Sequence, residues 1–325
     1  MKKNLYKLIL PFLLIILTSC EKEDSIFDFS SEQNQVFKAF GWDFSNQDIL
    51  KVEKVKNNIS VIFGYGGNIL VSIGEDGTLI IDNQFPQLQK NIMTEIKKLG
   101  GKNIDYVINT HWHFDHAEGN RAFGPKGSII IAHENSKEFM KKNNTINIVY
   151  VEYPQQAYTG SSLPKITFKD RMELKFNNNN ISLHNFGPGH TTGDTIVFFR
   201  EANIIHFGDI LNTDSMVFID SANGGSLAGM IKNLEGALKI INKDTIVIPG
   251  HGKITDYETV KKYLSALIIT KDKLTEMIGN NMSLEEITKN NPVKDLESIL
   301  GDTNVLIDRS YLSLIREGRN NEVIN

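Results

Sequence analysis

The sequence predicts an α+β fold in which two β-sheets pack face to face and helices cover their outer faces. Apolar, β-branched hairpin segments come first, strands and helices alternate next, and the same order then repeats toward the C-terminus. A single parallel sheet with helical crossovers would alternate strand and helix throughout. The order of segments therefore favours two facing sheets.

The N-terminal half supplies the clearest elements. Apolar runs separated by glycine-rich turns predict strands joined as hairpins over Val52–Asp82. Apolar residues at helical spacing predict a helix over Gln87–Leu99, which ends at Gly100. A strand at Ile104–Thr110 then runs directly into a group of histidines.

The remaining elements follow from the same kinds of pattern. Strands are predicted at Ser128–Ala132, Ile166–Phe168, Ile181–Phe186, Thr195–Arg200, Ile204–Phe207 and Thr245–Gly252, and helices at Glu134–Lys141 and Leu227–Ile241. Glycine, proline and serine predict a loop through Tyr153–Leu163. From Tyr257 onward the pattern indicates two or three amphipathic helices, which either pack as core, cover one side of the site or form a dimer contact.

The first residues predict an export signal. A basic start precedes the apolar run Leu8–Leu17, which is too short to cross a bilayer as a helix because that needs about 20 residues. The following LTSC resembles a bacterial lipobox, which implies removal of residues 1–19 and lipidation of Cys20, the only cysteine. The alternative is a chance cysteine beside an ordinary signal peptide. The expected location is the cell envelope, on the periplasmic or outer face of a bacterial membrane.

Composition limits the classes of function. Without residues 1–19 the chain has 32 basic and 39 acidic residues, a net charge of −7 with neutral histidines. This acidic balance, without a block of Lys or Arg, argues against nucleic acid as a partner and favours a small-molecule substrate. We expect a lipidated tether and lead-in over residues 20–50, one catalytic domain over 51–255 and a helical extension over 256–325.

Metal-binding side chains recur where apolar strands end. THWHFDH (residues 110–116) places three of the eight histidines and an aspartate within six positions, which brings no advantage in packing. HNFGPGHTTGD, HFGDIL and PGHG follow three later strands. Because strand ends meet at one rim of a sheet, we expect the four segments to line one site.

This pattern resembles the metallo-β-lactamase-fold hydrolases, a superfamily defined by an HxHxDH motif, a downstream His, a downstream Asp and a final His. The matching residues are His111, His113, Asp115, His116, His190, Asp209 and His251. The resemblance covers roughly residues 50–255 and implies a four-layer αβ/βα sandwich with extra C-terminal helices.

The resemblance also implies two metal ions. His111, His113 and His190 hold the first ion. Asp115, His116 and His251 hold the second, and Asp209 bridges both. Imidazole and carboxylate ligands without thiolate suit zinc first, with iron or manganese as alternatives. Such a pair would make a bridging hydroxide near neutral pH, and Asp115 would orient it or accept its proton.

Several residues keep a second interpretation. Asp209 is either a ligand or a cap of the turn after its strand. Asp82 either orients a metal-binding histidine or serves a turn. We expect structural roles for the other histidines, which are His133, His184 and His206. The aromatic residues beside the ligands either clamp an apolar substrate or pack under the loops; they are Tyr65, Trp112, Phe114 and Phe186.

The predicted activity is hydrolysis of an ester, thioester, lactone or β-lactam. The alternatives are an iron-dependent oxidoreductase of the same superfamily and a non-catalytic lipoprotein in which the metal stabilises a binding surface. The metal that the purified protein contains distinguishes the first alternative from hydrolysis. For the second alternative, removal of the metal would unfold the protein or weaken its binding, and there would be no turnover to lose.

Overall fold

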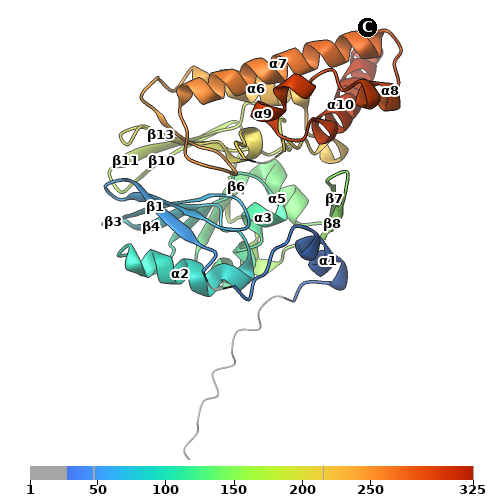
Figure 1. The fold of residues 1–325 in the computed structure, drawn as a ribbon. Coiled ribbons are helices and arrows are strands. Elements are labelled where there is room, and N and C mark those ends of the chain that lie inside the picture. Colours follow the sequence, from blue (N-terminus) through green and yellow to red (C-terminus); the bar gives the residue numbers. More distant parts are fainter. Residues whose placement is uncertain (1–27, 47, 215, 325) are drawn as a thin grey trace, which may run out of the picture.

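The structure, a computed structural model, describes residues 28–46, 48–214 and 216–324. Within these ranges, two mixed β-sheets lie face to face between layers of helices (Figure 1). The predicted α+β sandwich with additional C-terminal helices is confirmed. The expected signal peptide, Cys20 and the charged tether that follows it lie outside the described residues.

The first sheet has seven strands in the order β1-β2-β3-β4-β5-β6-β9. Their bounds are β1 (Lys51–Lys56), β2 (Ile59–Phe63), β3 (Ile69–Gly74), β4 (Gly77–Ile81), β5 (Tyr106–Ile108), β6 (Ile129–His133) and β9 (Ile166–Phe168). Strands β1 to β4 are antiparallel hairpins, whereas β4, β5, β6 and β9 are parallel. Alternation along β4 turns Leu79 and Ile81 toward the second sheet and Ile80 toward the outer helices.

The second sheet has five strands in the order β10-β11-β12-β13-β14. Their bounds are β10 (Arg171–Phe176), β11 (Asn179–His184), β12 (Ile196–Phe199), β13 (Ile204–His206) and β14 (Ile246–Ile248). Val197 and Phe199 of β12 pack against the first sheet, and Ile196 and Phe198 face the outer helices. Both faces of the central strands are therefore buried, which explains their nearly continuous apolar runs, whereas the edge strands β1 and β10 are largely exposed and polar.

Helices form the two outer layers, with α2 below the first sheet and α6 and α7 above the second (Figure 1). The α-helices are α1 (Ser31–Ala39), α2 (Gln89–Lys98), α3 (Phe114–Ala117), α4 (Asn120–Phe123), α5 (Glu134–Met140), α6 (Leu227–Leu238), α7 (Tyr257–Gly279), α8 (Leu284–Asn290), α9 (Glu297–Leu300) and α10 (Thr303–Ile324). Leu300 and Leu306 of the C-terminal helices join the core above the second sheet, so the extension packs onto the domain. Among the described residues, no helix has the length and apolar character that a bilayer span requires.

Several features differ from the sequence prediction. Helix α1 and strand β10 were not predicted, and the C-terminal segment forms four α-helices where two or three were expected. The expected loop at Tyr153–Leu163 begins inside a hairpin, because β7 (Asn144–Asn147) pairs with β8 (Glu152–Gln155). Both strands of this hairpin are short and carry polar residues, so the apolar pattern that reveals the other strands is missing.

Candidate metal centre

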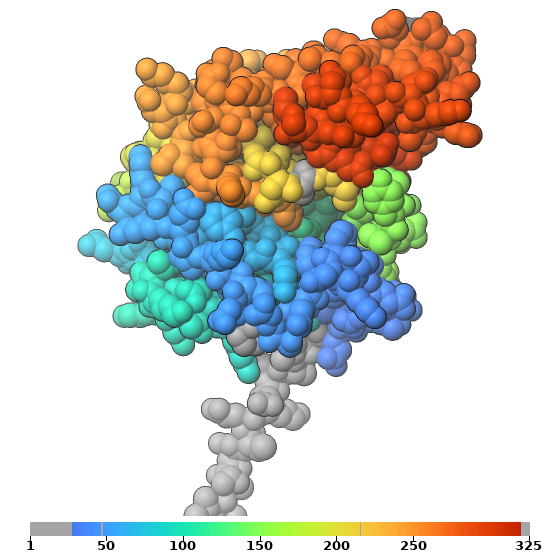
Figure 2. Space-filling model, in the orientation of Figure 1, coloured from blue at the N-terminus to red at the C-terminus, as the bar shows by residue number. Residues whose placement is uncertain are grey.

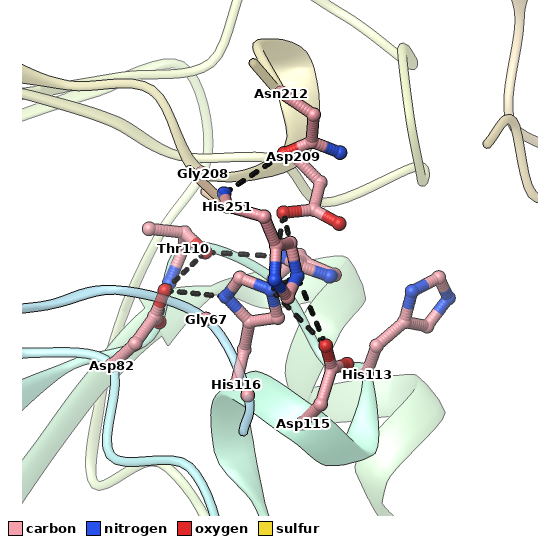
Figure 3. Close-up of polar contacts among 12 residues, drawn as sticks. Gly67, Asp82, Thr110, His113, Asp115, His116, Gly208, Asp209, Asn212 and His251 are labelled. Carbon is pink, nitrogen blue, oxygen red and sulfur yellow. Dashed lines mark hydrogen bonds and ion pairs between the residues drawn. The ribbon is translucent and has the colours of Figure 1, made fainter. Parts of the chain in front are cut away.

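The seven predicted ligands come together where strands of both sheets end. His111 and His113 follow β5, and Asp115 and His116 lie in α3. His190 lies in the loop after β11, Asp209 in a 3-10 helix (Gly208–Ile210) after β13, and His251 after β14. Figure 3 shows Asp115, His116, Asp209 and His251 turned toward one another. Three groups of these side chains place their ligand atoms within 4.8 Å of one another: His111–His113–His190, His111–His116–Asp209 and Asp115–His116–His251.

In the first group, nitrogen lone pairs face each other. His190 Nε2 lies 2.9 Å from His113 Nδ1 and 3.2 Å from His111 Nε2. The other ring nitrogens of two of these histidines already donate: His190 Nδ1 to the Phe218 carbonyl at 2.7 Å and His113 Nε2 to the Asp220 carboxylate at 3.0 Å. A neutral imidazole has only one N–H. The nitrogens that face each other therefore carry lone pairs.

His111 completes this group in the same way. The Thr110 hydroxyl donates to Asp82 Oδ2 at 2.8 Å, so it accepts from His111 Nδ1 at 3.0 Å and leaves the lone pair on His111 Nε2. Three converging lone pairs repel unless a cation lies between them. Nitrogens about 2.1 Å from a tetrahedral zinc ion lie about 3.4 Å apart, close to the observed separations. The donor set therefore fits a metal ion.

We call Asp115, His116 and His251 the second group, with Asp209 beside them. It pairs histidines with carboxylates. His116 Nε2 lies 3.1 Å from His251 Nε2 and 3.1 Å from Asp209 Oδ1. His251 Nε2 also lies 3.1 Å from Asp115 Oδ2. Asp209 Oδ2 lies 3.8 Å from His190 Nε2, so this one carboxylate faces both groups. The 3-10 helix that contains Asp209 has no side-chain cap, which leaves no support for the alternative turn role.

The electrostatics of the two groups differ. Burial lowers the pKa of His190 to about 4, and burial together with the neighbouring imidazoles holds the pKa of His111 well below its usual value. Burial also acts to lower the pKa of His116 and His251, but the nearby carboxylates, led by Asp209, outweigh it and raise both pKa values. The same contacts outweigh burial at Asp209 and hold its pKa well below the usual value. His111 and His190 of the first group are therefore neutral at pH 7, whereas the second group carries paired charges.

Asp82 lies behind this second group. It accepts hydrogen bonds from His116 Nδ1 at 2.7 Å and from the Thr110 backbone N–H and hydroxyl, each at 2.8 Å. Its backbone has a φ of +59°, a left-handed conformation that aspartate tolerates better than most residues. The structure thus places Asp82 where it orients a predicted ligand, in line with the first of its two interpretations.

The supporting partners of the first group were missed by sequence reasoning. Asp220, which is buried, orients His113 and accepts from Asn223 Nδ2 at 2.9 and 3.0 Å. The Phe218 carbonyl orients His190. Both lie in an irregular segment between the second sheet and α6, where no spacing links them to the histidines they contact. Asn212, whose Oδ1 accepts from the His251 backbone N–H at 3.0 Å, gave no signal either.

The other histidines lie outside the groups of predicted ligands. His206 Nε2 donates to the Asn68 carbonyl at 3.0 Å, and its Nδ1 accepts from the Gly208 N–H at 3.1 Å. His133 caps α5 by accepting from the Asn135 N–H at 3.1 Å. His184 stacks on Phe186 with ring centroids 5.5 Å apart. All three have contacts that fit the structural roles expected for them.

A pocket of about 260 Å³ opens onto the predicted ligands. Its floor contains His113, Asp115, His190, Asp209 and His251. Its walls are Phe40, Trp42, Tyr65, Phe114, Ile146, Ile148, Asn212, Met216 and Phe218. Of the four aromatic residues considered from sequence, Tyr65 and Phe114 thus line the pocket. Trp112 is buried against Phe139 with centroids 4.8 Å apart, and Phe186 packs beside the core above the second sheet.

Comparison with known proteins gives the family. The model of the metallo-beta-lactamase superfamily matches residues 58–252, more than half of the chain and all seven predicted ligands. The chain belongs to the metallo-beta-lactamase superfamily. This membership makes it a hydrolase of the metallo-β-lactamase fold, and its His and Asp groups fit the metal site of that family.

The relatives in this superfamily are distant. Metallo-beta-lactamase IND-1 of Chryseobacterium indologenes is 22% identical over 214 residues, which cover 63% of this chain and 83% of the relative. Metallo-beta-lactamase type 2 of Bacillus cereus is 24% identical over 192 residues, 58% of this chain and 68% of the relative. The crystal structure of DIM-1 metallo-beta-lactamase aligns with a TM-score of 0.54 and 24% identity, over 68% of this chain and 97% of that one. These likenesses establish the fold.

Proposed function

We propose that this protein is a dinuclear metal-dependent hydrolase, with zinc as the metal, that cleaves the acyl bond between the carbonyl carbon and the leaving atom of an ester, thioester, lactone or β-lactam. The observation that carries the proposal is the convergence of three imidazole lone pairs beside a second His and Asp group, at the floor of a pocket. His111, His113 and His190 would hold one ion. Asp115, His116 and His251 would hold the other, and Asp209 would bridge them.

When bound, two divalent cations would polarise a carbonyl oxygen and lower the pKa of a water molecule toward neutrality. Water then adds to the carbonyl carbon, the bond to the leaving oxygen, nitrogen or sulfur breaks, and a proton passes to the leaving atom. Asp115 faces the pocket with a side chain 14% exposed. Burial acts to raise its pKa, but His116 and His251 outweigh burial and lower it, so the carboxylate is ionised and able to orient the attacking water or accept its proton.

The test combines metal analysis with a substrate screen of the purified protein. We expect two equivalents of zinc per chain and turnover of at least one of nitrocefin, an acyl-homoserine lactone, a glutathione thioester and a 4-nitrophenyl ester. Asp115→Ala and Asp209→Asn should reduce that turnover by at least ~100-fold. His184→Gln removes a histidine outside the metal centre and should leave turnover unchanged. Full activity in Asp115→Ala would contradict its assigned role.

The same measurements separate the competing functions. Bound iron with visible absorption and no hydrolysis would favour the oxidoreductase alternative. Metal that stabilises the fold without any turnover would favour a non-catalytic binding protein. Hydrolysis is preferred because both ligand groups open onto a pocket, whereas a structural zinc site is closed by four protein ligands.

We further propose that Cys20 is lipidated and anchors the chain in the cell envelope. The support is the sequence alone, namely the basic start, the short apolar run and the LTSC that ends at Cys20. In cells that process lipoproteins, the protein should partition into a detergent phase, and Cys20→Ser should move it to the aqueous phase. Detergent partitioning that does not change in Cys20→Ser would refute the anchor.

A further inference from the structure

One wall of the pocket comes from chain outside the family match. That match begins at residue 58, whereas Phe40 and Trp42 lie in the lead-in between α1 and β1. The N-terminal segment (blue) and the β7–β8 hairpin (green) border a hollow on the face shown in Figure 2. The shape of this hollow is therefore a property of this chain as well as of its family.

The local sequence fixes the position of Trp42. Helix α1 begins with a capping box, in which Ser30 and Gln33 exchange hydrogen bonds. It ends in a Schellman motif, because Gly41 has a φ of +71° and its N–H donates to the Lys38 carbonyl, while the Trp42 N–H donates to the Phe37 carbonyl. The hydrophobic contact of this motif is the stacking of Trp42 on Phe37, with centroids 6.0 Å apart. The turn thus holds the indole beside the pocket.

Helix α1 is attached to the segment that carries the predicted ligands. Gln33 is fully buried, and its Nε2 donates to Tyr153 Oη at 2.9 Å. Tyr153 stacks on Phe114, which lies between His113 and Asp115 in the sequence, with ring centroids 3.7 Å apart and planes 14° apart. The wall and the predicted ligands therefore share one packed core.

The wall presents a row of aromatic faces. Trp42 is stacked with Phe40 at 5.0 Å and with Tyr65 at 6.1 Å between centroids. The β7–β8 hairpin adds Ile146 and Ile148 to the lining. These surfaces suit the burial of an apolar chain, which is worth about 0.8 kcal/mol per methylene, or roughly fourfold in affinity.

The walls carry no positive charge. None of the described residues that line the pocket is Lys or Arg, and its two carboxylates, Asp115 and Asp209, belong to the predicted ligand set. Asn212, the polar residue of the walls, is neutral. A carboxylate at the far end of a chain that lies against this wall, away from the metal ions at the floor, would therefore find no cationic side chain to replace its hydration.

From these observations we infer that, given the proposed hydrolase function, the substrate is a neutral ester or lactone whose apolar chain lies against Phe40, Trp42 and Tyr65. Trp42 is the specificity-determining residue. A pocket of about 260 Å³ has room for a short apolar chain. An anionic substrate of the same length, including a β-lactam with its carboxylate, is the poorer fit.

The kinetic test compares two substrates with acyl chains of equal length, 4-nitrophenyl hexanoate and the mono-4-nitrophenyl ester of adipic acid. The first chain ends in a neutral methyl group and the second in a carboxylate. We expect kcat/KM of the zinc-loaded protein to be at least ~10-fold higher for the neutral ester. Trp42→Ala should reduce this preference to about threefold or less, and Trp42→Phe should restore most of it. Tyr257→Ala, which truncates a partly buried aromatic residue outside the pocket, should leave the preference unchanged.

A gain of charge provides the reverse test. Met216→Lys places a cation on the wall and should shift the ratio of kcat/KM toward the anionic ester by about tenfold. Equal kcat/KM for the two esters in the wild type, or a preference unchanged in Trp42→Ala, would overturn the inference.

A binding measurement distinguishes failure of this inference from failure of the proposed hydrolase function. Calorimetric titration of the zinc-loaded protein with N-hexylacetamide and with 6-acetamidohexanoate compares a neutral and an anionic ligand without any reaction. Tighter binding of the neutral ligand by at least ~10-fold, lost in Trp42→Ala, supports the inference even if no ester is hydrolysed. Equal binding overturns it, even if nitrocefin is hydrolysed. Absence of all hydrolysis by the zinc-loaded protein overturns the proposed function alone.

Discussion

The carboxylate of Asp82 lies 2.7 Å from His116 Nδ1 and also accepts from the hydroxyl of Thr110, which in turn contacts His111. One acid therefore fixes the ring orientation of a histidine in each ligand group. Because both outer nitrogens are held as donors, both inner nitrogens face the site. His111 Nε2 presents a lone pair directly, and His116 Nε2 does so once it gives up its proton to make room for a metal ion.

Removal of this acid should weaken metal binding. We expect Asp82→Ala to lower metal affinity by about 10–100-fold, because His116 and Thr110 lose their shared acceptor. Asp82→Asn tolerates the positive φ and separates lost charge from backbone strain. Equilibrium dialysis against a zinc buffer measures the affinity. Asp105→Asn, which changes an acid that accepts from the Thr78 N–H far from the ligands, serves as the control. Wild-type affinity in both Asp82 variants would refute the role.

Asp220 should matter to the first ligand group as Asp82 does to the second. In Asp220→Asn, His113 Nε2 loses its carboxylate partner, so the tautomer that leaves a lone pair on Nδ1 is less favoured. The expected loss of metal affinity is again about 10–100-fold, confined to one of the two equivalents. The same dialysis, analysed for two sites, checks it. An equal loss at both sites would show that the effect is general destabilisation.

Gly67 is required by the close approach of the β2–β3 turn to His116. A Cβ at this position would lie 2.1 Å from His116 Cε1, so Gly67→Ala must displace the ring. We expect about one equivalent of metal to be lost, with a cost of about 1–3 kcal/mol in the free energy of unfolding. Gly279→Ala is the matched control, because a Cβ there meets nothing within 4 Å. Metal analysis and denaturant unfolding should show the first variant impaired and the second normal.

The two ligand groups should lose metal at different pH values. Protons compete with metal for imidazole, and the pKa values of His116 and His251 are raised, whereas that of His190 is lowered to about 4. On acidification, protons therefore displace the ion of the second group first. The number of metal ions bound per chain, measured after dialysis at successively lower pH, should fall from two to one and reach zero only at a still lower pH. Simultaneous loss of both equivalents would contradict this order.

The ligands were predictable because they follow strands whose apolar pattern is strong. His111 and Asp209 follow β5 and β13 by three residues each. The sequence predicts that they meet at the rim of one sheet, but the two strands belong to different sheets whose ends meet at one edge of the sandwich. The residues that orient the ligands were harder to predict. Asp220 lies 107 positions from the histidine it contacts, and only the packed fold brings the two together.

The wall formed by Trp42 was missed for a different reason. The sequence predicts only a tether and lead-in over residues 20–50, since α1 is short and largely polar. Its ends carry recognisable signals, namely Ser30 and Gln33 at the start and Phe40-Gly41-Trp42 at the end. These signals predict a helix, but the stacking of Trp42 on Tyr65 depends on tertiary packing, which local sequence does not determine.

The central claim is that converging lone pairs in this protein hold two divalent cations. Anomalous diffraction at the zinc edge from crystals of the zinc-loaded protein tests it most directly. The account predicts two peaks per chain, one bound by His111 Nε2, His113 Nδ1 and His190 Nε2, and one bound by Asp115, His116 and His251, with Asp209 between them. Absence of a peak among these side chains, or coordination of His113 through Nε2, would contradict it.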